Sequence, residues 1–550
     1  MGPVSKSDEL LVSPNKFEVR YTDLAGRIAR LETPHGVIET PAFIPVVHPV
    51  RQSVSPKFLR SLGFDAIITN AYIALEKYGE IACKKGIHDI VNFDGIVMTD
   101  SGGYQVLEYG TIDVDAKTIA QFEKDIRSDI CVPLDKPTGY GLDYNIAKNY
   151  VEQTLTNAKD TLSLVLGKSE PRISMVNKED SVAHQVLWAG PIQGAEHLDL
   201  VRHSSSMLDK MGYPLMAIGS PVEIMETYEF SILARMIASA KGVVPTKPIH
   251  LFGAGHPLTI PLAVALGCDM FDSASYMLYA KDNRYMHANG TARLEDLSYL
   301  TCHCAVCAKY SSAKELIELD KETRTIEIAK HNLYILKSEV DAVKQAIMDG
   351  RLWEYVIQKS HAHPKLMESI EILKDFELIG AGTPIFKSRA IFLCDPLDQY
   401  RPEALHFREM VSTFKSKKNR EGHRKLILYP DTKIHPFYAT QDFKRLAKKF
   451  PGSQICTYNP FLGVIPSEVS DIFPAAHNLS VKLTAYHSND FLCFVESLTH
   501  FLTNNKFEGI VIFADQFMKS ILKNNKSVLK GLDARVFDSV KDMSLKNLMI

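Results

Sequence analysis

The chain has 550 residues, of which 45% are hydrophobic and 23% are charged, and its formal net charge at pH 7 is −2. This length predicts about two to four domains, and the composition is ordinary for a soluble globular protein. No apolar run approaches the roughly 20 residues of a membrane-spanning helix, and the first residues lack the apolar core of a signal peptide, so a membrane or secreted protein is not expected.

The charge balance and the cysteines indicate which partners and which cellular compartment to expect. A net charge near zero gives no global sign of a nucleic-acid partner, so local basic patches would have to supply any such contact. Three of the nine cysteines are crowded together, and the others are scattered singly: Cys83, Cys131, Cys268, Cys394, Cys456 and Cys493. This pattern favours a metal site in the reducing cytoplasm over a framework of disulfides.

A regular alternation of apolar runs and helical stretches follows a hairpin-like opening at residues 17–47. Eight runs rich in Ile, Val and Phe are expected to be strands: Ala42–Val47, Asp65–Thr69, Gly95–Thr99, Ile130–Leu134, Val186–Ile192, Leu215–Ile218, Ile249–Phe252 and Asp269–Phe271. Most are separated by stretches with helical periodicity, such as residues 145–166 and 221–241. Eight buried strands alternating with helices predict an α/β fold of the (β/α)8 TIM-barrel type.

Polar residues and glycines stand at or just after the ends of these runs. They are Asn70, Asp100, Asp135, Gln193, Gly219–Ser220, Gly253–Gly255 and Asp272. A barrel of this kind carries its active site at the carboxyl ends of its strands, so these residues are expected to meet in one pocket. The alternative is that they only form turns, since Asp and Gly often follow strands.

Several of these side chains suit a planar base. Asp135 can accept two N–H groups at once, as the amino and ring N–H edge of guanine requires. Gln193 offers a donor and an acceptor for the O6 or N7 edge of a purine. Tyr104 and Phe252 could cover the two faces of the ring, and Gly102–Gly103 would let the backbone approach it.

Two further carboxylates point to a reaction. Asp100 follows a predicted strand within Met98–Gln105, and Asp272 ends the apolar run of another. One could attack as a nucleophile while the other moves protons.

A metal-binding pattern lies downstream. Three cysteines form a C-x-C-x2-C cluster, and a histidine follows after 23 residues: Cys302, Cys304, Cys307 and His331. A closed set of three thiolates and one imidazole is typical of a structural Zn²⁺ ion, one per chain, with no position open to a substrate. The alternative, three cysteines gathered in a core by chance, is disfavoured by the polar neighbours Thr301, His303 and Lys309.

The chain is expected to divide into a catalytic barrel at residues 1–370, with the zinc-binding part at about 295–335, and a C-terminal α/β region at residues 371–550 whose basic patches suit contact with RNA. Strands in the second region are predicted at Ala390–Leu393, Lys425–Leu428, Ser453–Thr457 and Gly509–Phe513.

Local basic patches occur in both regions. Between Thr413 and Lys448 there are ten Lys or Arg residues against three Asp or Glu. Weaker groups are Lys519, Lys523, Lys526 and Lys530 in the second region, and Lys281, Arg284 and Arg293 after Asp272. Such patches suit an RNA backbone. A solvated surface is an equal alternative for the group after Asp272, and it is the usual interpretation of charge runs like those in the second region.

Six motifs together resemble the tRNA-guanine transglycosylase family, in its archaeal, archaeosine-forming branch. TDSGGYQ, GPIQG, HLFGAGHP, GCDMFDSASY, CHCAVC and KHNLY stand in the family's order within residues 16–370. The resemblance implies a TIM barrel with a zinc-binding insertion. It also implies an enzyme that exchanges a D-loop guanine of tRNA, at position 15 in the family, for 7-cyano-7-deazaguanine (preQ0), the first step of archaeosine formation.

The resemblance also implies roles. Asp272 would attack C1′ of the ribose and form a covalent tRNA–enzyme intermediate, while Asp100 would act as the acid and base. The base-binding residues would be Tyr104, Asp135, Gln193, Gly219, Ser220 and Phe252, and the zinc ligands Cys302, Cys304, Cys307 and His331. Ser220 departs from the family because a second glycine is common there, and its side chain adds a group near the pocket.

The implied partners are tRNA, preQ0, guanine and a second copy of the chain. Archaeal members commonly finish with a PUA domain, whose pattern this sequence lacks, so either the enzyme works without one or a separate PUA-type RNA-binding protein supplies it. One rival function is a catalytically silent, zinc-stabilised RNA-binding subunit, which the presence of both Asp100 and Asp272 argues against. Another is the bacterial-type activity on an aminomethyl base.

Overall fold

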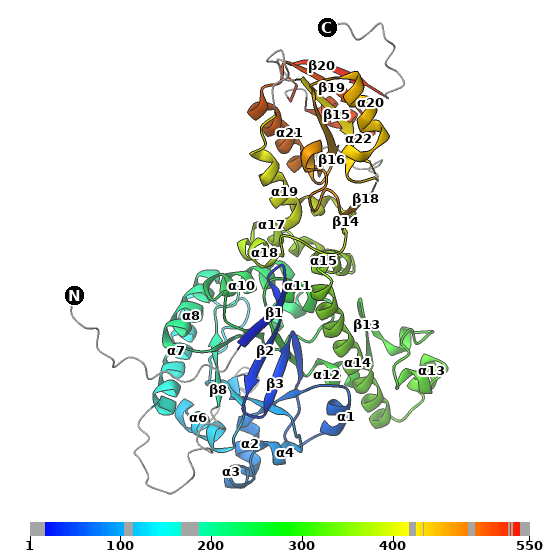
Figure 1. Cartoon of the computed structure of the whole chain (residues 1–550). Helices are drawn as coiled ribbons and strands as arrows, with labels where there is room; N and C mark the ends of the chain where they lie inside the picture. Colours follow the sequence, from blue (N-terminus) through cyan, green and yellow to red (C-terminus); the bar gives the residue numbers. More distant parts are fainter. Residues whose placement is uncertain are drawn as a thin grey trace, which may run out of the picture. The chain divides into compact units, whose positions relative to one another are not determined.

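The computed structural model describes residues 17–103, 114–166, 186–416, 425–432, 434–481, 490–525, 528–529 and 532–538. The chain forms two units, Met1–Gly382 and Thr383–Ile550 (Figure 1). Among the described residues, no helix is both long enough and apolar enough to cross a membrane.

The first unit is a barrel of eight parallel strands, in the order β4-β11-β10-β9-β8-β7-β6-β5. The strands are β4 (Ala42–Pro45), β5 (Ala66–Asn70), β6 (Ile96–Asp100), β7 (Ile130–Cys131), β8 (Leu187–Ile192), β9 (Leu215–Ile218), β10 (Ile249–Leu251) and β11 (Met270–Ser273). A parallel bridge between Val46 and Ile68 joins the two edges. Each of the eight predicted runs therefore overlaps a barrel strand, and the predicted fold class is confirmed.

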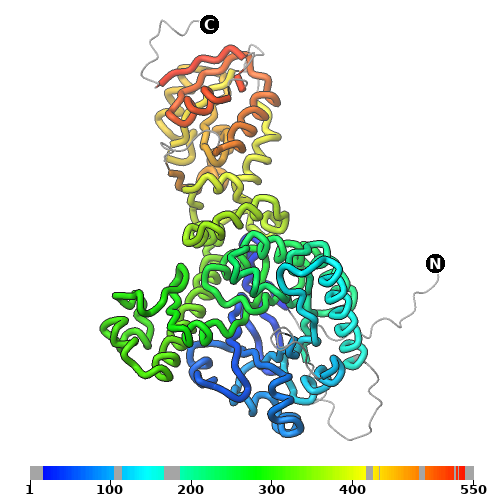
Figure 2. The backbone as a smooth tube through the Cα atoms, turned by 180° about the vertical axis from the view of Figure 1, so that it is seen from behind, coloured from blue at the N-terminus to red at the C-terminus, as the bar shows by residue number. Residues whose placement is uncertain are grey.

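Helices cover the outside of the barrel, as Figure 2 shows from the opposite side. They include α1 (Pro56–Ser61), α2 (Ala71–Tyr78), α3 (Glu80–Lys85), α4 (Ile87–Val91), α6 (Ala116–Asp125), α7 (Tyr144–Leu166), α8 (Leu198–Met211), α9 (Val222–Glu226), α10 (Phe230–Val243), α11 (Ile260–Ala265), α12 (Ser275–Lys281), α15 (Leu352–Ser360), α16 (Pro364–Ser369), α17 (Ile372–Asp375) and α18 (Glu377–Gly382). Because helices cover the outside and side chains fill the inside, a strand such as β8 is buried along its whole length.

One helical stretch predicted from the sequence, residues 221–241, is two helices in the structure. The chain leaves α9 and enters α10 through Tyr228, whose φ of 58° lies in the left-handed region. A left-handed residue cannot continue a right-handed helix, so the break occurs there.

A three-stranded antiparallel sheet closes the amino-terminal end of the barrel. Its strands are β1 (Phe17–Asp23), β2 (Gly26–Thr33) and β3 (Gly36–Thr40). Leu31 and Ile38 from this sheet pack with Ile44, Ile96 and Leu215, which stand at or near the starts of barrel strands. The polar residues described below lie at the opposite, carboxyl-terminal end of the barrel.

An insertion follows α12. It contains the hairpin of β12 (Arg284–His287) and β13 (Gly290–Arg293), the loop that carries the cysteine cluster, α13 (Ala313–Ile317), and the 28-residue helix α14 (Lys321–Met348). Asp320 caps α14 by accepting the backbone N–H groups of Glu322 and Thr323.

The second unit is an α/β fold with a five-stranded sheet in the order β17-β16-β15-β19-β20. Its main elements are α19 (Pro402–Ser412), β15 (Lys425–Pro430), α20 (Gln441–Lys449), β16 (Gln454–Asn459), β17 (Gly463–Pro466), α21 (Leu492–Asn505), β19 (Gly509–Phe513), α22 (Gln516–Asn524) and β20 (Asp533–Phe537). A separate parallel pair is β14 (Ile391–Leu393) with β18 (Asn478–Ser480). The four predicted strands are present, and the structure adds β17, β18 and β20.

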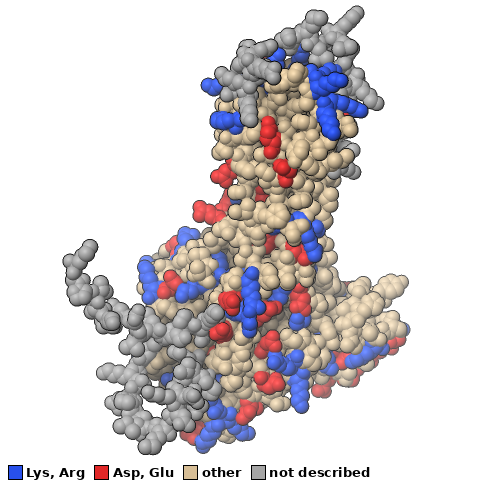
Figure 3. All heavy atoms as spheres, viewed as in Figure 1, with Lys and Arg blue, Asp and Glu red and all other residues tan. Residues whose placement is uncertain are grey.

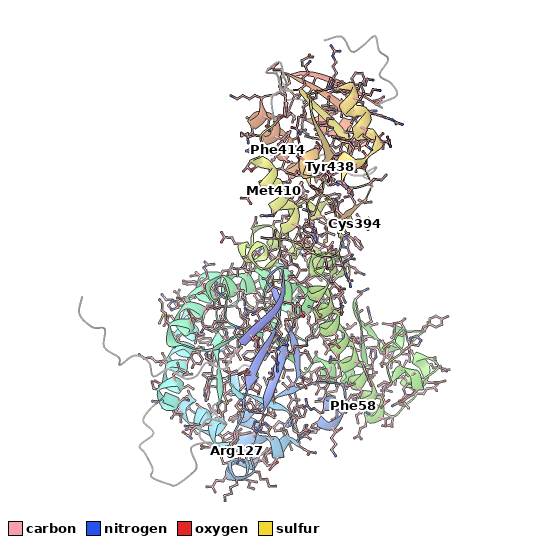
Figure 4. The ribbon with its side chains drawn as sticks, viewed as in Figure 1. Phe58, Arg127, Cys394, Met410, Phe414 and Tyr438 are labelled. Carbon is pink, nitrogen blue, oxygen red and sulfur yellow. The ribbon has the colours of Figure 1, made fainter. Side chains whose placement is uncertain are left out.

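Aromatic side chains form much of the core of the second unit. Phe494 lies 5.0 Å from Phe517, measured between ring centroids, and Phe414 stacks on Phe501 at 6.2 Å. Met410 and Phe414, both labelled in Figure 4, pack against this core from α19 and the residues that follow it. Aromatic pairs of this kind add specific contacts to the area that they bury.

Candidate active site

Three carboxylates face one another at the carboxyl-terminal end of the barrel. Asp100 is the last residue of β6, Asp272 lies in β11, and Asp135 follows β7. The charges of Asp135 and Asp272 both raise the pKa of Asp100. A Cβ atom added to Gly103 would lie 1.9 Å from Oδ1 of Asp135, so the glycine turn and this carboxylate touch. Asp100, Gly103, Asp135 and Asp272 therefore meet at this end of the barrel, as the sequence predicted.

Asp100 is poised between its two protonation states near neutral pH. Burial, followed by the charges of Asp135 and Asp272, raises its pKa to about 7, against hydrogen bonds that favour the ionised form. Those bonds come from the Gly102 N–H to Oδ1 at 3.3 Å and from Asn70 Nδ2 to Oδ2 at 3.2 Å. A carboxyl group with this pKa can both give and take a proton at neutral pH.

Asp272 is held by one of its two oxygens. The Gly253 N–H donates to Oδ1 at 3.1 Å, and His250 Nε2 lies 2.9 Å from the same oxygen. Neither group engages Oδ2. Gly253 has a φ of 65°, and a Cβ atom there would meet Val222 Cγ2 at 2.4 Å, so the turn that brings this N–H to Asp272 requires glycine.

Asp135 is tied to Gln193. Gln193 Nε2 donates to Oδ2 of Asp135 at 2.6 Å, and burial raises the pKa of Asp135 to about 6 despite this bond. The Gln193 amide oxygen accepts from Thr138 N and Thr138 Oγ1, both at 3.1 Å, and from Ser220 Oγ at 2.8 Å. Gln193 was predicted to offer a base both a donor and an acceptor. In the structure its amide oxygen already accepts three hydrogen bonds from the protein, so only its N–H group is left to face a base.

The Gly219–Ser220 turn lies against this amide. A Cβ atom on Gly219 would meet Gln193 Nε2 at 2.2 Å, so only glycine leaves room for the side chain. The Gly219 N–H donates to Ile192 O at 2.9 Å, which continues the pairing of the strands. Of the two backbone N–H groups predicted to bind the base, that of Ser220 is the one with no protein acceptor among the described residues.

Of the two residues predicted to stack on the base, the structure describes only Phe252. Phe252 follows β10 and is half-buried against the barrel interior, with its ring 4.8 Å from that of His250. Tyr104 lies outside the described residues. His250 and Thr138 were not predicted as site residues, and their contacts join segments 22 and 55 residues apart along the chain.

The metal-binding pattern is brought together in the insertion. The ligand atoms of Cys302, Cys304, Cys307 and His331 all lie within 4.8 Å of one another. His331 Nδ1 is 3.5 Å from the Cys304 sulfur and 3.3 Å from that of Cys307, while Nε2 lies 2.7 Å from Met286 O. Nε2 therefore carries the proton, and Nδ1 faces the sulfurs as a ligand atom.

These separations fit a tetrahedral ion. With bonds of about 2.3 Å to sulfur and about 2.0 Å to nitrogen, ligand atoms around one Zn²⁺ ion lie about 3.5 Å apart. A second group, His35, His88 and Asp129, has nitrogen-to-oxygen distances of 2.5 and 2.9 Å. Those are hydrogen-bond lengths, and Asp129 also accepts the Val97 and His35 N–H groups, so this group is a buried hydrogen-bond hub.

Basic side chains lie on two of the elements that the sequence indicated. Arg284 and Arg293 face each other as partners in the β12–β13 hairpin. In the second unit, Lys444, Arg445 and Lys448 are exposed on α20, where Figure 3 shows a group of basic side chains. Around the barrel, acidic and basic side chains are mixed on the face seen there. Lys526 and Lys530 lie outside the described residues.

Known proteins resemble the chain over most of its length. The family model described as queuine tRNA-ribosyltransferase matches residues 23–365. The tRNA-guanine(15) transglycosylase of Sulfolobus acidocaldarius is 39% identical over 465 residues, which cover 83% of this chain and 87% of that protein. Proteins of the same name from Aeropyrum pernix and Pyrococcus furiosus are 38% and 37% identical, over 84% and 82% of this chain and 86% and 72% of their own lengths.

Proposed function

Because the chain belongs to the queuine tRNA-ribosyltransferase family, we propose that it is a tRNA-guanine transglycosylase, a transferase that exchanges a guanine of tRNA for another base. The relatives' name places the exchanged guanine at position 15. We propose the same position here, with preQ0 as the incoming base and archaeosine as the modification that it begins.

Asp272 is the proposed nucleophile. Its carboxylate attacks C1′ of the ribose, the bond from C1′ to the guanine nitrogen breaks, and the bonding electrons leave with the base. The tRNA is then joined to the enzyme through an ester-like bond, and its phosphate backbone stays intact. The contacts of Oδ1 with Gly253 and His250 support Oδ2 as the attacking atom.

Asp100 is the proposed acid and base. In its protonated form it gives a proton to the departing guanine. In its ionised form it removes a proton from the incoming base, whose nitrogen then attacks C1′ and releases Asp272. A pKa of about 7 supports both tasks, because each form is populated near neutral pH.

The base is proposed to lie between Tyr104 and Phe252. Asp135 accepts N–H groups from its amino and ring edge, while the outward N–H of Gln193 Nε2 and the N–H of Ser220 donate to its carbonyl oxygen. The pocket has donors on one edge and an acceptor on the other, which matches the pattern of guanine and of 7-deazaguanines.

Zn²⁺ is the ion proposed for Cys302, Cys304, Cys307 and His331, one per chain, where it would crosslink the insertion. The proposed partners are tRNA, contacted by the basic side chains of the hairpin and of α20, a second copy of the chain, and a separate PUA-type RNA-binding protein. Light scattering of the pure protein, alone and with tRNA, tests the homodimer, and capture on tRNA from a lysate tests the PUA-type partner. A cytoplasmic location is proposed with these partners.

The observation that carries the proposal is the pair of carboxylates, one held by a single oxygen and one with a pKa near neutrality. The test incubates a tRNA transcript with labelled preQ0 and the parent protein, Asp272→Asn or Asp100→Asn. Asp282→Asn, an exposed carboxylate close in sequence, is the matched control. We expect label in tRNA with the parent and the control only, and a denaturation-stable tRNA–protein adduct with the parent.

Two outcomes would redirect the proposal. Incorporation of an aminomethyl base but not of preQ0 would replace the substrate and leave the mechanism in place. Binding of tRNA by all proteins with incorporation by none would favour the silent RNA-binding subunit.

A further inference from the structure

Ser220 adopts a backbone conformation that its side chain does not favour. Its φ is 61°, in the left-handed region where glycine is at ease and other residues are strained. A serine in this turn therefore needs a compensating contact. The hydroxyl supplies it by donating to Oε1 of Gln193 at 2.8 Å and accepting the Gly139 N–H at 3.2 Å.

The orientation of the Gln193 amide follows from the backbone. Thr138 N–H lies 3.1 Å from one end of the amide, and since a backbone N–H can only donate, that end must be the oxygen. The two hydroxyls are oriented in the same way. Ser220 Oγ accepts the Gly139 N–H and Thr138 Oγ1 accepts the Gly194 N–H, so both hydroxyl protons are left for Gln193.

Three donors thus converge on Oε1 of Gln193, and Nε2 is left on the side of Asp135 and the pocket. One N–H of Nε2 is used by Asp135. Rotating the amide by half a turn would place an NH2 group against three donors, and each of the three adds to the cost of the flipped state. Gln193 can therefore offer the ligand a donor and no acceptor.

We propose that Ser220 is a specificity-determining residue, whose hydroxyl acts together with the two Thr138 donors to hold Gln193 with its donor outward, so that the pocket prefers bases with a carbonyl at position 6 over those with an amino group there. The inference rests on the proposed function, because it concerns the base pocket of that reaction. It goes further by assigning part of the choice between 6-oxo and 6-amino bases to a hydroxyl that itself need not touch the base.

The test measures binding of free guanine and of 2,6-diaminopurine, its 6-amino counterpart, by calorimetry, and the kinetics of labelled guanine exchange into tRNA. Ser220→Ala keeps a side chain at the left-handed position and loses the hydroxyl. Ser220→Gly also loses the hydroxyl and relieves the backbone. Thr138→Val and Thr138→Ser form a second pair, in which only the serine keeps the donor to Oε1.

We expect both Ser220 variants and Thr138→Val to bind guanine about tenfold more weakly and to lose about tenfold of the preference for guanine over 2,6-diaminopurine, as loss of one hydrogen bond would produce. The KM for guanine should rise more than kcat falls, and Thr138→Ser should behave as the parent. Melting temperatures identify any variant that fails to fold, and the other pair then decides the question.

Different results overturn different statements. If Ser220→Gly and Thr138→Val both keep the parent's preference, the hydroxyls do not set the amide and the inference is wrong, while the proposed function stands. If the parent binds neither base and exchanges none, the proposed function fails and the inference falls with it.

Discussion

His250 Nε2 lies 2.9 Å from Oδ1 of Asp272, and the His250 side chain is fully buried beside it. Neither ring nitrogen of His250 has a hydrogen-bond partner among the described residues, so Nε2 lies against the carboxylate without donating to it. The Gly253 N–H donates a hydrogen bond to the same oxygen at 3.1 Å. Both groups therefore contact Oδ1, and in the proposed mechanism Oδ2 is the oxygen that attacks the ribose.

Replacing His250 should therefore slow the reaction more than it weakens binding. In His250→Phe an aromatic ring still fills the buried site, but the polar nitrogen beside Oδ1 is lost. We expect kcat to fall by about tenfold, because a polar group that lies against the carboxylate is removed, with the KM for tRNA within about twofold of the parent. His250→Gln retains a polar side chain and should lose less. Unchanged kcat in His250→Phe would reduce His250 to a packing role.

The pKa of Asp100 sets a limit on the alkaline side of the pH profile. In the proposed mechanism the first half of the reaction needs protonated Asp100, whose pKa is raised to about 7. The pH dependence of kcat/KM reports the pKa values of groups in the free enzyme. As far as Asp100 is concerned, we therefore expect kcat/KM for tRNA to be constant below pH 7 and to fall about tenfold per pH unit above it. Stopped-flow or initial-rate assays between pH 5.5 and about 9 would measure it.

A variant of Asn70 should move the pH at which the activity begins to fall. Its Nδ2 donates to Asp100 at 3.2 Å, and its Oδ1 caps α2 by accepting the Ile73 N–H. Asn70→Ser keeps a capping oxygen and loses the reach to Asp100. Because the lost bond favoured the ionised carboxylate, the pKa of Asp100 should rise and the alkaline limb should move to higher pH. A shift to lower pH would contradict this account of the site.

The barrel could be predicted because its strands are buried on both faces and read as short apolar runs, as β8 does. Two of the three strands that were missed have weaker signals. β18 is three residues long, and the five residues of β20 are half-buried or exposed and include Asp533 and Arg535. Paired only with β19 at one edge of the sheet, β20 lacks the apolar pattern of a central strand.

The site could be predicted to the level of which residues converge, because strand ends in a parallel barrel share one edge. The pairings between their side chains could not. Gln193 contacts Thr138 from 55 residues away, and His250 meets Asp272 across neighbouring strands. Thr138 belongs to no residue pattern with a chemical meaning of its own, and His250 opens the HLFGAGHP motif, which assigns it no partner. Only the structure therefore joins these two residues to Gln193 and Asp272.

A buried acid behind the site should make stability depend on pH. Glu123 is fully buried, its Oε1 accepts from Thr99 Oγ1 at 2.8 Å, and burial raises its pKa well above the ordinary value. The folded protein thus binds a proton that the unfolded chain releases above its pKa of about 4.3. The stabilising contribution is complete below that pH and is lost as pH rises toward the folded pKa.

Glu123→Gln carries a neutral side chain of the same size and removes this dependence. We expect its free energy of unfolding to match the parent's near pH 4.5 and to exceed it by about 1.4 kcal/mol per pH unit above that, until the folded pKa is reached. Urea titrations at several pH values would show the widening gap. Glu80→Gln, on the exposed surface of α3, is the matched control and should show no such gap.

Loss of the metal should unfold the insertion and leave the barrel standing. Cys307 is buried, and its sulfur lies 3.3 Å from His331 Nδ1 and 3.2 Å from the Tyr285 hydroxyl. We expect about one zinc ion per chain in the parent and none in Cys307→Ser, because three ligands hold a structural ion far more weakly than four. Cys456→Ser, which removes a buried thiol from the second unit, should keep the metal.

Limited proteolysis should cut Cys307→Ser between β13 and α14 while the barrel fragments resist, since the hairpin and helix would no longer be crosslinked. Equal zinc content in both variants would show that the cluster does not hold the ion.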